Sequence, residues 1–586
     1  MLAEVARLLP ECLPWAVTCY GSPSFLQFGQ FTLTSSTGVQ QGDPFASDLF
    51  ALVLQPVIDA IESEVPSLDA HAWFHDDSNS VGTKEELSRV VQVVQRDGPV
   101  RGLHLNLDKS SVWSPLATGP GEADPLKCGI KRVEDTGIKL LGCPVGDRAF
   151  VLRFLQEKVD KVRTITKELS SLHHPHLEFV LLRCCLALPK FIFLLRTTDS
   201  STFTEVLQEF DDVTREALSG ILGGAVTEQG WSQAKIPVCM GGLGLRAALD
   251  HGAAAFATSL TSSHPFCLKL LHQAEDSPLH LPQDLLTNLS NKMGVEEPLT
   301  SESLVGFSQK AVSTKIDLNN MRLFSEQLQE QGCVRDIARF SSVSLKDSHA
   351  GDWLTVVPSP GLGLRLQPAE FVAALRHRLG HPIYTVDGPC PACGKPSDKM
   401  GDHAMNCAWQ GERIARHNHL RDLLHNTAAA AALAPAKEGR FLLPGEGGRP
   451  ADLLIPGWAN GRDAAWDVTV INPLQESMVR GAATTPGHAL SHAHKRKLDK
   501  SWEPCHAQGI AFLPIAAESL GAWHSSAIAE VKRLGSALAR HTGEEEGITI
   551  ARLFQKLSVC LMRGNAALFN NRSPPEQSVP SDEIVW

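Results

Sequence analysis

Hydrophobic and polar positions along the first 150 residues predict short helices and strands in turn. Apolar residues recur at helical spacing over residues 50–61, directly after a loop with two glycines at residues 38–44. A short, partly apolar run then ends at Asp76 and Asp77, and residues 78–80 have the composition of a turn. We therefore expect a loop, a helix and a strand that ends in paired carboxylates at a tight turn.

The middle of the chain, from residue 151 to residue 345, carries mostly amphipathic helical patterns. Such helices normally bury one face against their neighbours. Residues 348–367 are rich in Gly, Ser and Pro, which predicts a boundary between domains. Aliphatic runs typical of strands then follow Asp452 and Asp467, so we expect each of these aspartates to head a strand.

Composition bounds the class of protein. A chain of 586 residues predicts roughly two to four domains, and 43% hydrophobic with 20% charged residues is typical of a globular protein. The net charge of −11 gives no overall basic surface for nucleic acid, although local basic surfaces remain compatible with it. Fourteen scattered cysteines indicate a reducing compartment. We expect a soluble, unsecreted protein without a membrane span.

Asp76 and Asp77 have the chemistry of a nucleotidyl-transfer site. Such transfer uses two Mg²⁺ ions about 3.5–4 Å apart, and Mg²⁺ binds carboxylate oxygens while it keeps several waters. Adjacent residues of a strand point to opposite faces, so one carboxylate can hold metal while the other supports it. The alternative for an isolated Asp-Asp pair is a solvated turn.

Cys390, Cys393, His403 and Cys407 form a C-x2-C-x9-H-x3-C pattern. A structural zinc site takes four tetrahedral sulfur or nitrogen ligands, and two close pairs on one loop are a simple way to provide them. The pattern therefore predicts a zinc knuckle. Four buried or reactive side chains that share no metal are the alternative.

Asp452 and Asp467 are separated by one strand pattern and can meet across a hairpin to share a divalent metal. A metal-bound water would then be the nucleophile for phosphodiester hydrolysis. The simplest arrangement has a lysine two residues after the second carboxylate, where this chain has Thr469. The basic run at residues 494–500 could supply that cation from another element. Two unrelated carboxylates at strand edges are the alternative.

Four elements in the first 150 residues resemble the reverse transcriptase domain of non-LTR retrotransposons. They are listed in chain order: Gly38-Val39-Gln40-Gln41-Gly42-Asp43-Pro44, Phe74-His75-Asp76-Asp77, Gly102-Leu103-His104-Leu105-Asn106-Leu107-Asp108-Lys109 and Leu140-Leu141-Gly142. The resemblance implies that Asp76 and Asp77 are catalytic. It further implies nucleotide or nucleic-acid contacts from five residues: Gln41, Gly42, Asp43, Pro44 and Lys109.

The second half resembles the C-terminal zinc knuckle and restriction-like endonuclease of site-specific non-LTR retrotransposons. The resemblance implies that Asp452 and Asp467 are metal carboxylates and that Lys497, with Lys500 or Lys495 as alternates, is the displaced catalytic lysine. It matches Glu438 to a further acidic Mg²⁺ ligand. Arg416 is a candidate contact to DNA phosphate, although a helix face paired with nearby acids is an equal alternative.

The expected fold is multidomain, α+β and α/β. We expect a partial reverse transcriptase palm, a helical thumb and linker, a linker with one helix, a zinc knuckle, a restriction-endonuclease-like α/β domain and a disordered tail. Their expected bounds, in this order, are residues 1–150, 151–345, 346–385, 386–410, 411–570 and 571–586.

Together the resemblances imply a retrotransposon-derived RNA-directed DNA polymerase and DNA endonuclease that acts in target-primed reverse transcription. No Asp precedes Asp43, so we expect the first catalytic strand of the polymerase to be missing. We therefore expect a truncated copy with an inactive polymerase, beside an endonuclease that keeps its acidic pair.

The implied cofactors are Mg²⁺ or Mn²⁺, and Zn²⁺. The implied partners are template RNA and target DNA, with dNTP only for a complete polymerase, in an intracellular and, by the resemblance, nuclear location. The alternatives are a catalytically dead, zinc-containing nucleic-acid-binding protein and a relic without a present role.

Overall fold

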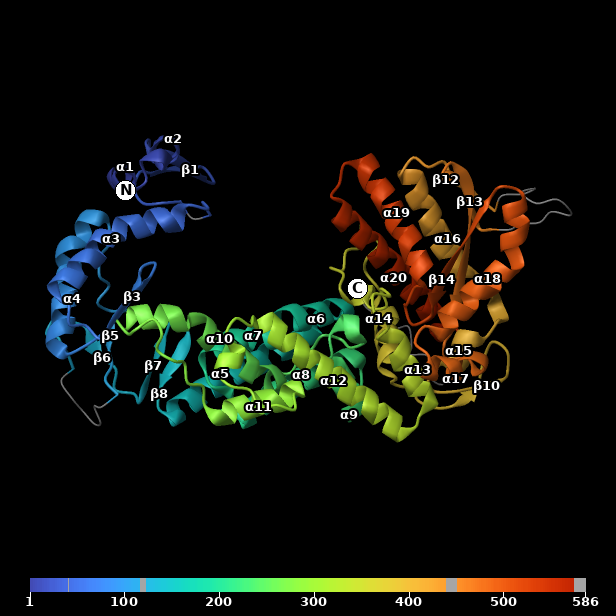
Figure 1. The fold of residues 1–586 in the computed structure, drawn as a ribbon, viewed down its shortest axis with the longest axis horizontal. Helices are drawn as coiled ribbons and strands as arrows, with labels where there is room; N and C mark the ends of the chain where they lie inside the picture. Colours follow the sequence, from blue (N-terminus) through green and yellow to red (C-terminus); the bar gives the residue numbers. More distant parts are fainter. Residues whose placement is uncertain (41, 116–122, 439–450, 574–586) are drawn as a thin grey trace. The chain divides into compact units, whose positions relative to one another are not determined.

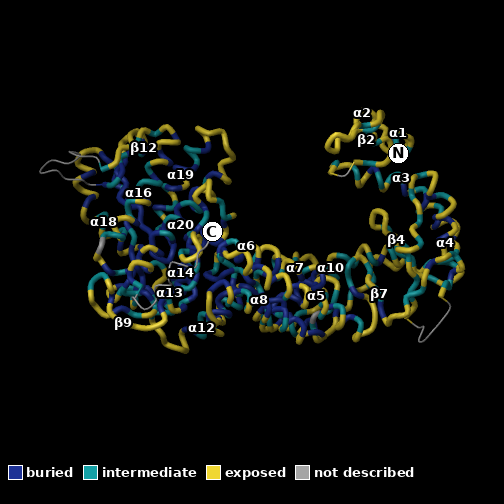
Figure 2. Tube along the Cα trace, turned by 180° about the vertical axis from the view of Figure 1, so that it is seen from behind, coloured by how far each residue is buried: buried dark blue, intermediate teal, exposed yellow. Residues whose placement is uncertain are grey.

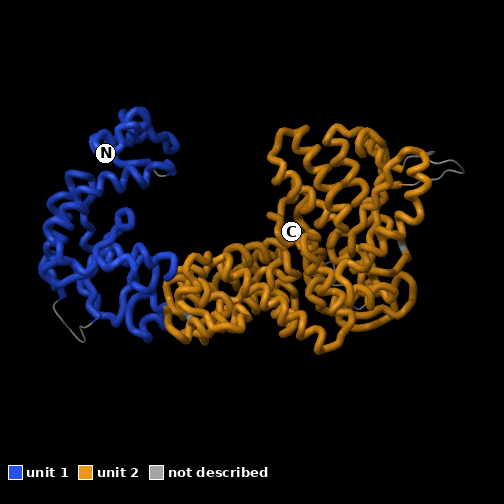
Figure 3. The backbone as a smooth tube through the Cα atoms, viewed as in Figure 1, with its two compact units in different colours: residues 1–154, 260–280 blue, residues 155–259, 281–586 orange. Residues whose placement is uncertain are grey.

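The computed structural model describes residues 1–40, 42–115, 123–438 and 451–573. The chain is a mixed α+β protein, 57% helical, with small sheets. Its backbone divides into two compact units, coloured separately in Figure 3. Unit 1 comprises Met1–Phe154 and Leu260–His280, and unit 2 comprises Leu155–Ser259 and Leu281–Trp586. In the described part of the chain, no helix is both long enough and apolar enough to cross a membrane.

Unit 1 is built from helices and hairpin-sized sheets. Its helices are α1 (Leu2–Leu8), α2 (Leu13–Tyr20), α3 (Ala46–Glu64) and α4 (Lys84–Asp97), together with the start of α5 and the end of α10. Its strands pair two by two: β1 (Ser24–Phe28) with β2 (Phe31–Ser35), β3 (Ala70–Phe74) with β4 (Asp77–Val81), β5 (Ser111–Val112) with β6 (Lys131–Arg132), and β7 (Gly137–Leu140) with β8 (Cys143–Gly146). Within the described residues, the aspartate hairpin β3–β4 therefore has no further strand beside it.

Helices α3 and α4 form the small core next to this hairpin. Val57 and Ile61 of α3 pack against Val90 and Val94 of α4, with Trp73 of β3 at the edge. Helix α4 begins with a capping box, because the Thr83 and Glu86 side chains each accept a backbone N–H at the helix start.

The helices expected across residues 151–345 are present. They are α5 (Arg148–Leu169), α6 (Pro175–Leu181), α7 (Leu188–Thr197), α8 (Thr204–Leu222), α9 (Glu228–Lys235), α10 (Ala248–Leu270), α11 (Gln283–Met293), α12 (Gln309–Gln331) and α13 (Val334–Val343). The buried carboxylate of Asp211 on α8 accepts the N–H groups of Ala248 and Leu249, at 2.7 and 3.0 Å, and so caps the start of α10.

Unit 2 also contains a four-stranded sheet in the order β11 (Ala436–Lys437), β12 (Leu453–Ala459), β13 (Arg462–Ile471) and β14 (Ala511–Glu518). The first three strands are antiparallel, and β13 and β14 are parallel. The remaining helices are α14 (Pro368–Leu379), α15 (Asp402–Asn406), α16 (Glu412–Ala430), α17 (Glu476–Thr484), α18 (His488–Ala507), α19 (Ser525–Thr542) and α20 (Glu546–Asn570). Two further strands, β9 (Gly388–Pro389) and β10 (Pro396–Ser397), form a separate pair.

Helices cover both faces of the four-stranded sheet (Figure 1). On β13, Ala464, Trp466 and Val468 lie in the large core with residues of α16, α19 and α20, whereas Ala465 packs with residues of α18. This alternation is the ordinary two-residue period of a strand buried on both faces. Asp467 therefore belongs to the face that α18 covers.

Residues 348–367, whose composition predicts a boundary, are packed into unit 2. Trp353 and Leu354 are buried in the same core as the sheet, and the backbone N–H of Trp353 donates to Ser558 Oγ of α20 at 3.2 Å. Figure 2 shows this core as the dark blue interior of unit 2. The segment is therefore irregular and partly buried, and residues 360–363 are exposed.

Helix α20 is long and buries many of its side chains. It packs against α14, α16 and α19, and Gly564 faces α16. A Cβ at position 564 would lie 2.5 Å from Arg416 Cγ and 2.9 Å from Arg416 Cβ. The close approach of the two helices therefore requires the glycine.

The substitution Gly564→Ala is expected to lower the free energy of unfolding by about 1–3 kcal/mol. Both helices are fixed, so the added methyl group overpacks the core. Thermal and urea unfolding of the full chain measure the change. Gly547→Ala is the control on the same helix, since its Cβ would meet no atom closer than 3.5 Å. An alanine at 564 that is as stable as the one at 547 would contradict the packing described.

Glu518, the last residue of β14, is fully buried and accepts a hydrogen bond from Ser342 Oγ of α13. Burial raises the pKa of Glu518 to about 7, against an ordinary value of 4.5. The folded protein therefore holds a proton there that the unfolded chain has already released. Stability falls as the pH rises from about 4.5 to about 7.

Glu518→Gln, which needs no proton, is expected to remove the contribution of Glu518 to this pH dependence and to raise stability at pH 8 by up to about 3 kcal/mol relative to the wild type. Unfolding temperatures between pH 5 and pH 8 measure it. Glu503→Gln, at an exposed position of α18, should leave the wild-type slope unchanged. Equal slopes for the wild type and Glu518→Gln would refute the assignment.

Candidate functional sites

The paired aspartates lie at a two-residue turn between β3 and β4. Phe74 pairs with Asp77 in the hairpin, His75 takes a left-handed backbone with φ of 55°, and Asp76 completes the turn. Both carboxylates are exposed. The turn predicted at residues 78–80 is wrong in position, because these residues belong to β4 and the turn comes at residues 75–76.

Among the described residues, no third carboxylate, imidazole or thiol joins Asp76 and Asp77 within 4.8 Å to form a metal-binding group. The hairpin presents two acidic side chains to solvent, with the alternate directions that a strand and its turn impose. A third metal ligand for nucleotidyl transfer is not assembled there.

The glycine loop before α3 is closed by Asp43. Its carboxylate accepts hydrogen bonds from Tyr20 Oη and, at 2.9 Å, from the backbone N–H of Phe45. Gly42 has a φ of 96°, which explains a glycine at this position. Gly42 and Pro44 are exposed, as is Lys109, whereas the predicted Gln41 lies outside the described residues.

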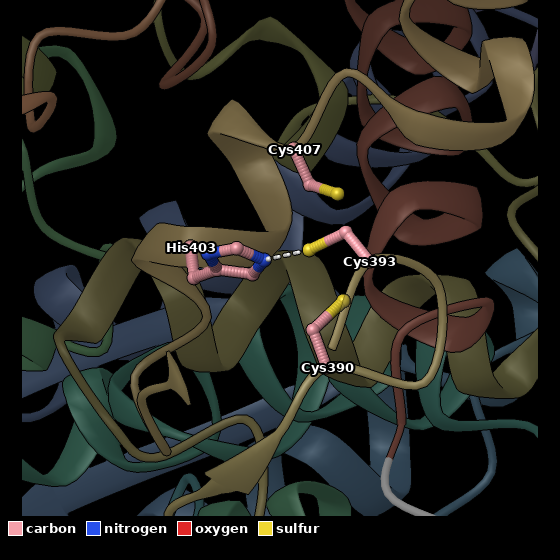
Figure 4. Close-up of side chains that lie close together, drawn as sticks. All are labelled: Cys390, Cys393, His403 and Cys407. Carbon is pink, nitrogen blue, oxygen red and sulfur yellow. Dashed lines mark hydrogen bonds between the residues drawn. The ribbon is translucent and has the colours of Figure 1, made fainter. Parts of the chain in front are cut away.

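The three cysteines and the histidine of the knuckle pattern converge on one point (Figure 4). Their ligand atoms all lie within 4.8 Å of one another, and Cys393 Sγ is 3.3 Å from His403 Nε2. In a tetrahedral zinc site with bonds of about 2.3 Å, sulfur ligands lie about 3.8 Å apart. The set Cys390, Cys393, His403 and Cys407 could therefore hold a zinc ion with all four positions filled by protein, as in a structural site.

The pKa shifts of His403 and Cys407 favour the metal-binding forms of these side chains, whereas the neighbouring thiols raise the pKa of Cys393. Burial lowers the pKa of His403, which favours the neutral imidazole that ligates metal. Burial alone would raise the pKa of the Cys407 thiol, but the adjacent Arg572 guanidinium and a backbone N–H outweigh it and the pKa lies below its ordinary value. Arg572 is fully buried and also binds Glu412 Oε2 at 2.8 Å. The end of α20 and the start of α16 therefore meet at the zinc cluster.

The second site is a buried carboxylate pair on the four-stranded sheet. Asp452 immediately precedes β12, and its backbone N–H donates to Trp466 O at 3.0 Å, which sets it across from Asp467. The two carboxyl groups lie close enough for each to shift the pKa of the other. The prediction that Asp467 heads its strand is wrong. Asp467 lies in the middle of β13, because the pairing of β13 with β12 begins at Arg462.

Lys497 completes this pair. Its Nζ lies 3.0 Å from Asp467 Oδ1 and 2.8 Å from Oδ2, whereas Lys495 and Lys500 are exposed on α18. Burial raises the pKa of Asp467, with a further increase from Asp452, and the Lys497 ammonium offsets this only in part. Lys497 is therefore the lysine that the structure brings to the pair.

His417 of α16 lies at the other end of the pair. Its Nε2 is 3.0 Å from Asp452 Oδ2 and 3.0 Å from the carbonyl oxygen of Val468. Burial alone would raise the pKa of Asp452, but the contact with His417 and the N–H of Val468 bring it below its ordinary value. The sequence gives a histidine beside Arg416 but no sign of which of the two faces the strands.

Arg416, the candidate phosphate contact, is buried in the interior rather than exposed at the surface. Its Nη1 donates to Asn565 Oδ1 of α20 at 2.7 Å, and burial lowers its pKa to about 10. Glu438 lies next to β11, where its Oε1 pairs with Arg421 Nη1 at 2.7 Å. No described group of three or more candidate ligands forms around Asp452 and Asp467, so Glu438 does not complete a three-carboxylate site. Both residues stabilise the surroundings of the pair.

No protein-family model matches the chain. It is similar to the retrotransposable element SLACS 132 kDa protein of Trypanosoma brucei gambiense, with 26% identity over 229 residues. The similarity covers 39% of this chain and 19% of the length of that protein. The finding relates the chain to a retrotransposon protein.

The zinc cluster can be tested apart from any activity. Wild-type protein is expected to bind one zinc ion per chain by elemental analysis, and Cys390→Ser to lose it because a tetrahedral ligand is removed. The unfolding temperature should fall by about 10 °C, since metal binding contributes to folding. Cys333→Ser, at an exposed cysteine outside the cluster, should keep both zinc and stability. Wild-type protein that folds fully without zinc and does not bind it would contradict the site.

Proposed function

We propose that the chain is a retrotransposon-derived reverse transcriptase/endonuclease with its DNA endonuclease centre at Asp452, Asp467 and Lys497. The observation that carries this proposal is the meeting of the three side chains from the start of β12, the middle of β13 and α18. The similarity to a retrotransposable-element protein supports the same class. In this proposal residues 411–570 are a restriction-like nuclease domain, and residues 386–410 are its zinc knuckle.

The residues present fit a Mg²⁺ or Mn²⁺ ion, because Asp452 and Asp467 offer the carboxylate oxygens that these cations prefer. When bound, the ion lowers the pKa of a water ligand and neutralises charge on the phosphate. Lys497 adds an ammonium beside Asp467, where a scissile phosphate brings more negative charge. In the reaction the water oxygen bonds to phosphorus, one P–O ester bond breaks, and the departing oxygen takes a proton.

The polymerase portion enters the proposal with a smaller role. Unit 1 would derive from a reverse transcriptase palm, followed by a helical thumb and linker at residues 151–345. Asp76 and Asp77 would be its metal carboxylates, but the described residues bring no third ligand to them. We therefore assign the chain's own chemistry to the nuclease, acting on target DNA in the nucleus.

A zinc-containing nucleic-acid-binding protein without catalysis is the second candidate. It is favoured by the contact of both Asp467 oxygens with Lys497, since an ion pair of this kind can be purely structural. The exposed side of α18 also carries Lys495, Arg496 and Lys500, which are available for phosphate contacts.

Nicking of supercoiled plasmid by the full chain, with Mg²⁺ or Mn²⁺, separates the two candidates. The endonuclease proposal expects metal-dependent nicking that Asp467→Asn reduces at least about 100-fold, because a metal ligand is weakened while the shape of the side chain is kept. Asp499→Asn, at an exposed position of α18, is the control and should nick like the wild type.

Folded, zinc-loaded wild-type protein that binds DNA but does not nick it would favour the binding protein. Nicking that Asp467→Asn leaves intact would place the activity elsewhere and refute the assigned centre.

A further inference from the structure

The imidazole of His417 contacts Asp452 of the carboxylate pair, and it does so from α16 rather than from the sheet. Its partner atoms are Asp452 Oδ2 and Val468 O, both 3.0 Å from Nε2. A carboxylate oxygen and a peptide carbonyl are both acceptors, so Nε2 must carry the hydrogen. His417 therefore donates toward Asp452 and does not offer a lone pair there.

The same oxygen of Asp452 receives a second donor. The backbone N–H of Val468 lies 2.7 Å from Asp452 Oδ2. Two donors thus hold Oδ2 from the side of α16 and β13, and we assign Oδ1 to the metal. The carboxylate is oriented before any ion arrives, which is what a precise metal site requires.

The helix that carries His417 is itself fixed. The preceding residue, Arg416, is buried and bonded to Asn565 of α20, and Gly564 allows the two helices to approach closely. His417 is therefore presented to Asp452 by a rigid element. The Asp452 backbone forms two hydrogen bonds: its N–H donates to Trp466 O, and its carbonyl oxygen accepts the N–H of Glu438. The side chain can still rotate, and the contact with His417 restricts that rotation.

We propose that His417 is a positioning residue for the divalent-metal site: it holds Asp452 Oδ2 through Nε2–H, so that Oδ1 faces the metal position beside Asp467. This inference rests on the proposed metal site of the nuclease. It assigns His417 no contact with the metal, with DNA or with the attacking water. Loss of such an orienting partner typically weakens metal affinity 10–100-fold.

The test measures Mn²⁺ binding to the zinc-loaded full chain by electron paramagnetic resonance, together with the Mn²⁺ dependence of nicking. His417→Ala is expected to weaken Mn²⁺ binding by about 10–100-fold and to shift the metal concentration for half-maximal nicking by the same factor. The nicking rate at saturating Mn²⁺ should change much less. His417→Gln, which keeps a terminal N–H donor, should restore part of the affinity.

His419→Ala, at an exposed position two residues along α16, is the matched control and should bind Mn²⁺ like the wild type. Unchanged or tighter binding by His417→Ala would overturn the inference, and tighter binding would mean that His417 competes with the metal. Wild-type protein that shows no Mn²⁺ site sensitive to Asp467→Asn would overturn it as well.

The binding measurement also separates this inference from the proposed function. A wild-type Mn²⁺ site that weakens in His417→Ala, in a protein that never nicks DNA, would support His417 as a positioning residue while refuting the endonuclease.

Discussion

The close packing of α16 on α20 is the contact on which both candidate sites depend. Arg416 lies buried against Gly564 and Asn565, and its guanidinium donates a hydrogen bond to the amide oxygen of Asn565. The next residue of α16, His417, consequently faces the strands and reaches Asp452. The same two helices converge at the zinc cluster, where Arg572, after α20, joins Cys407 and Glu412. One helix pair therefore positions the cysteine–histidine cluster at its end and a carboxylate pair along its side.

The second constraint is the two-residue period of β13. Val468 belongs to the large core, yet its backbone groups serve the site: its N–H donates to Asp452 and its carbonyl accepts from His417. Asp467, one residue earlier, faces the layer of α18 and meets Lys497. A shift of one residue in the register of β13 would exchange these roles and bury Asp467 in the apolar core. The site is therefore a consequence of how the sheet is packed on both faces.

The features that can be predicted from the sequence are those whose residues lie close together along the chain. The cysteine and histidine ligands lie within eighteen residues, so their spacing alone is enough to bring them together, as the cluster shows. Helical patterns at 151–345 likewise reflect short-range periodicity. The sequence does not predict the roles of Arg416 and His417. Two polar neighbours on a helix of weak amphipathicity do not reveal which one faces inward. The sequence pattern predicts Asp467 at the start of a strand, because it does not show where pairing with β12 begins.

The two candidate sites differ in how their charge is balanced without metal, and this difference bears on their roles. The carboxylate pair lies between a histidine and a lysine of the same chain, so its negative charge is offset within the fold. Burial of two acids at this position is tolerable for that reason, and the fold around them does not need an ion. The cluster of three cysteines and one histidine has Arg572 as its charged neighbour at Cys407, and hydrogen bonds within its loop include those from the Asp402 and His403 N–H groups to Asp398. A resident zinc ion would close that loop, whereas an ion at the carboxylates would come and go with the reaction.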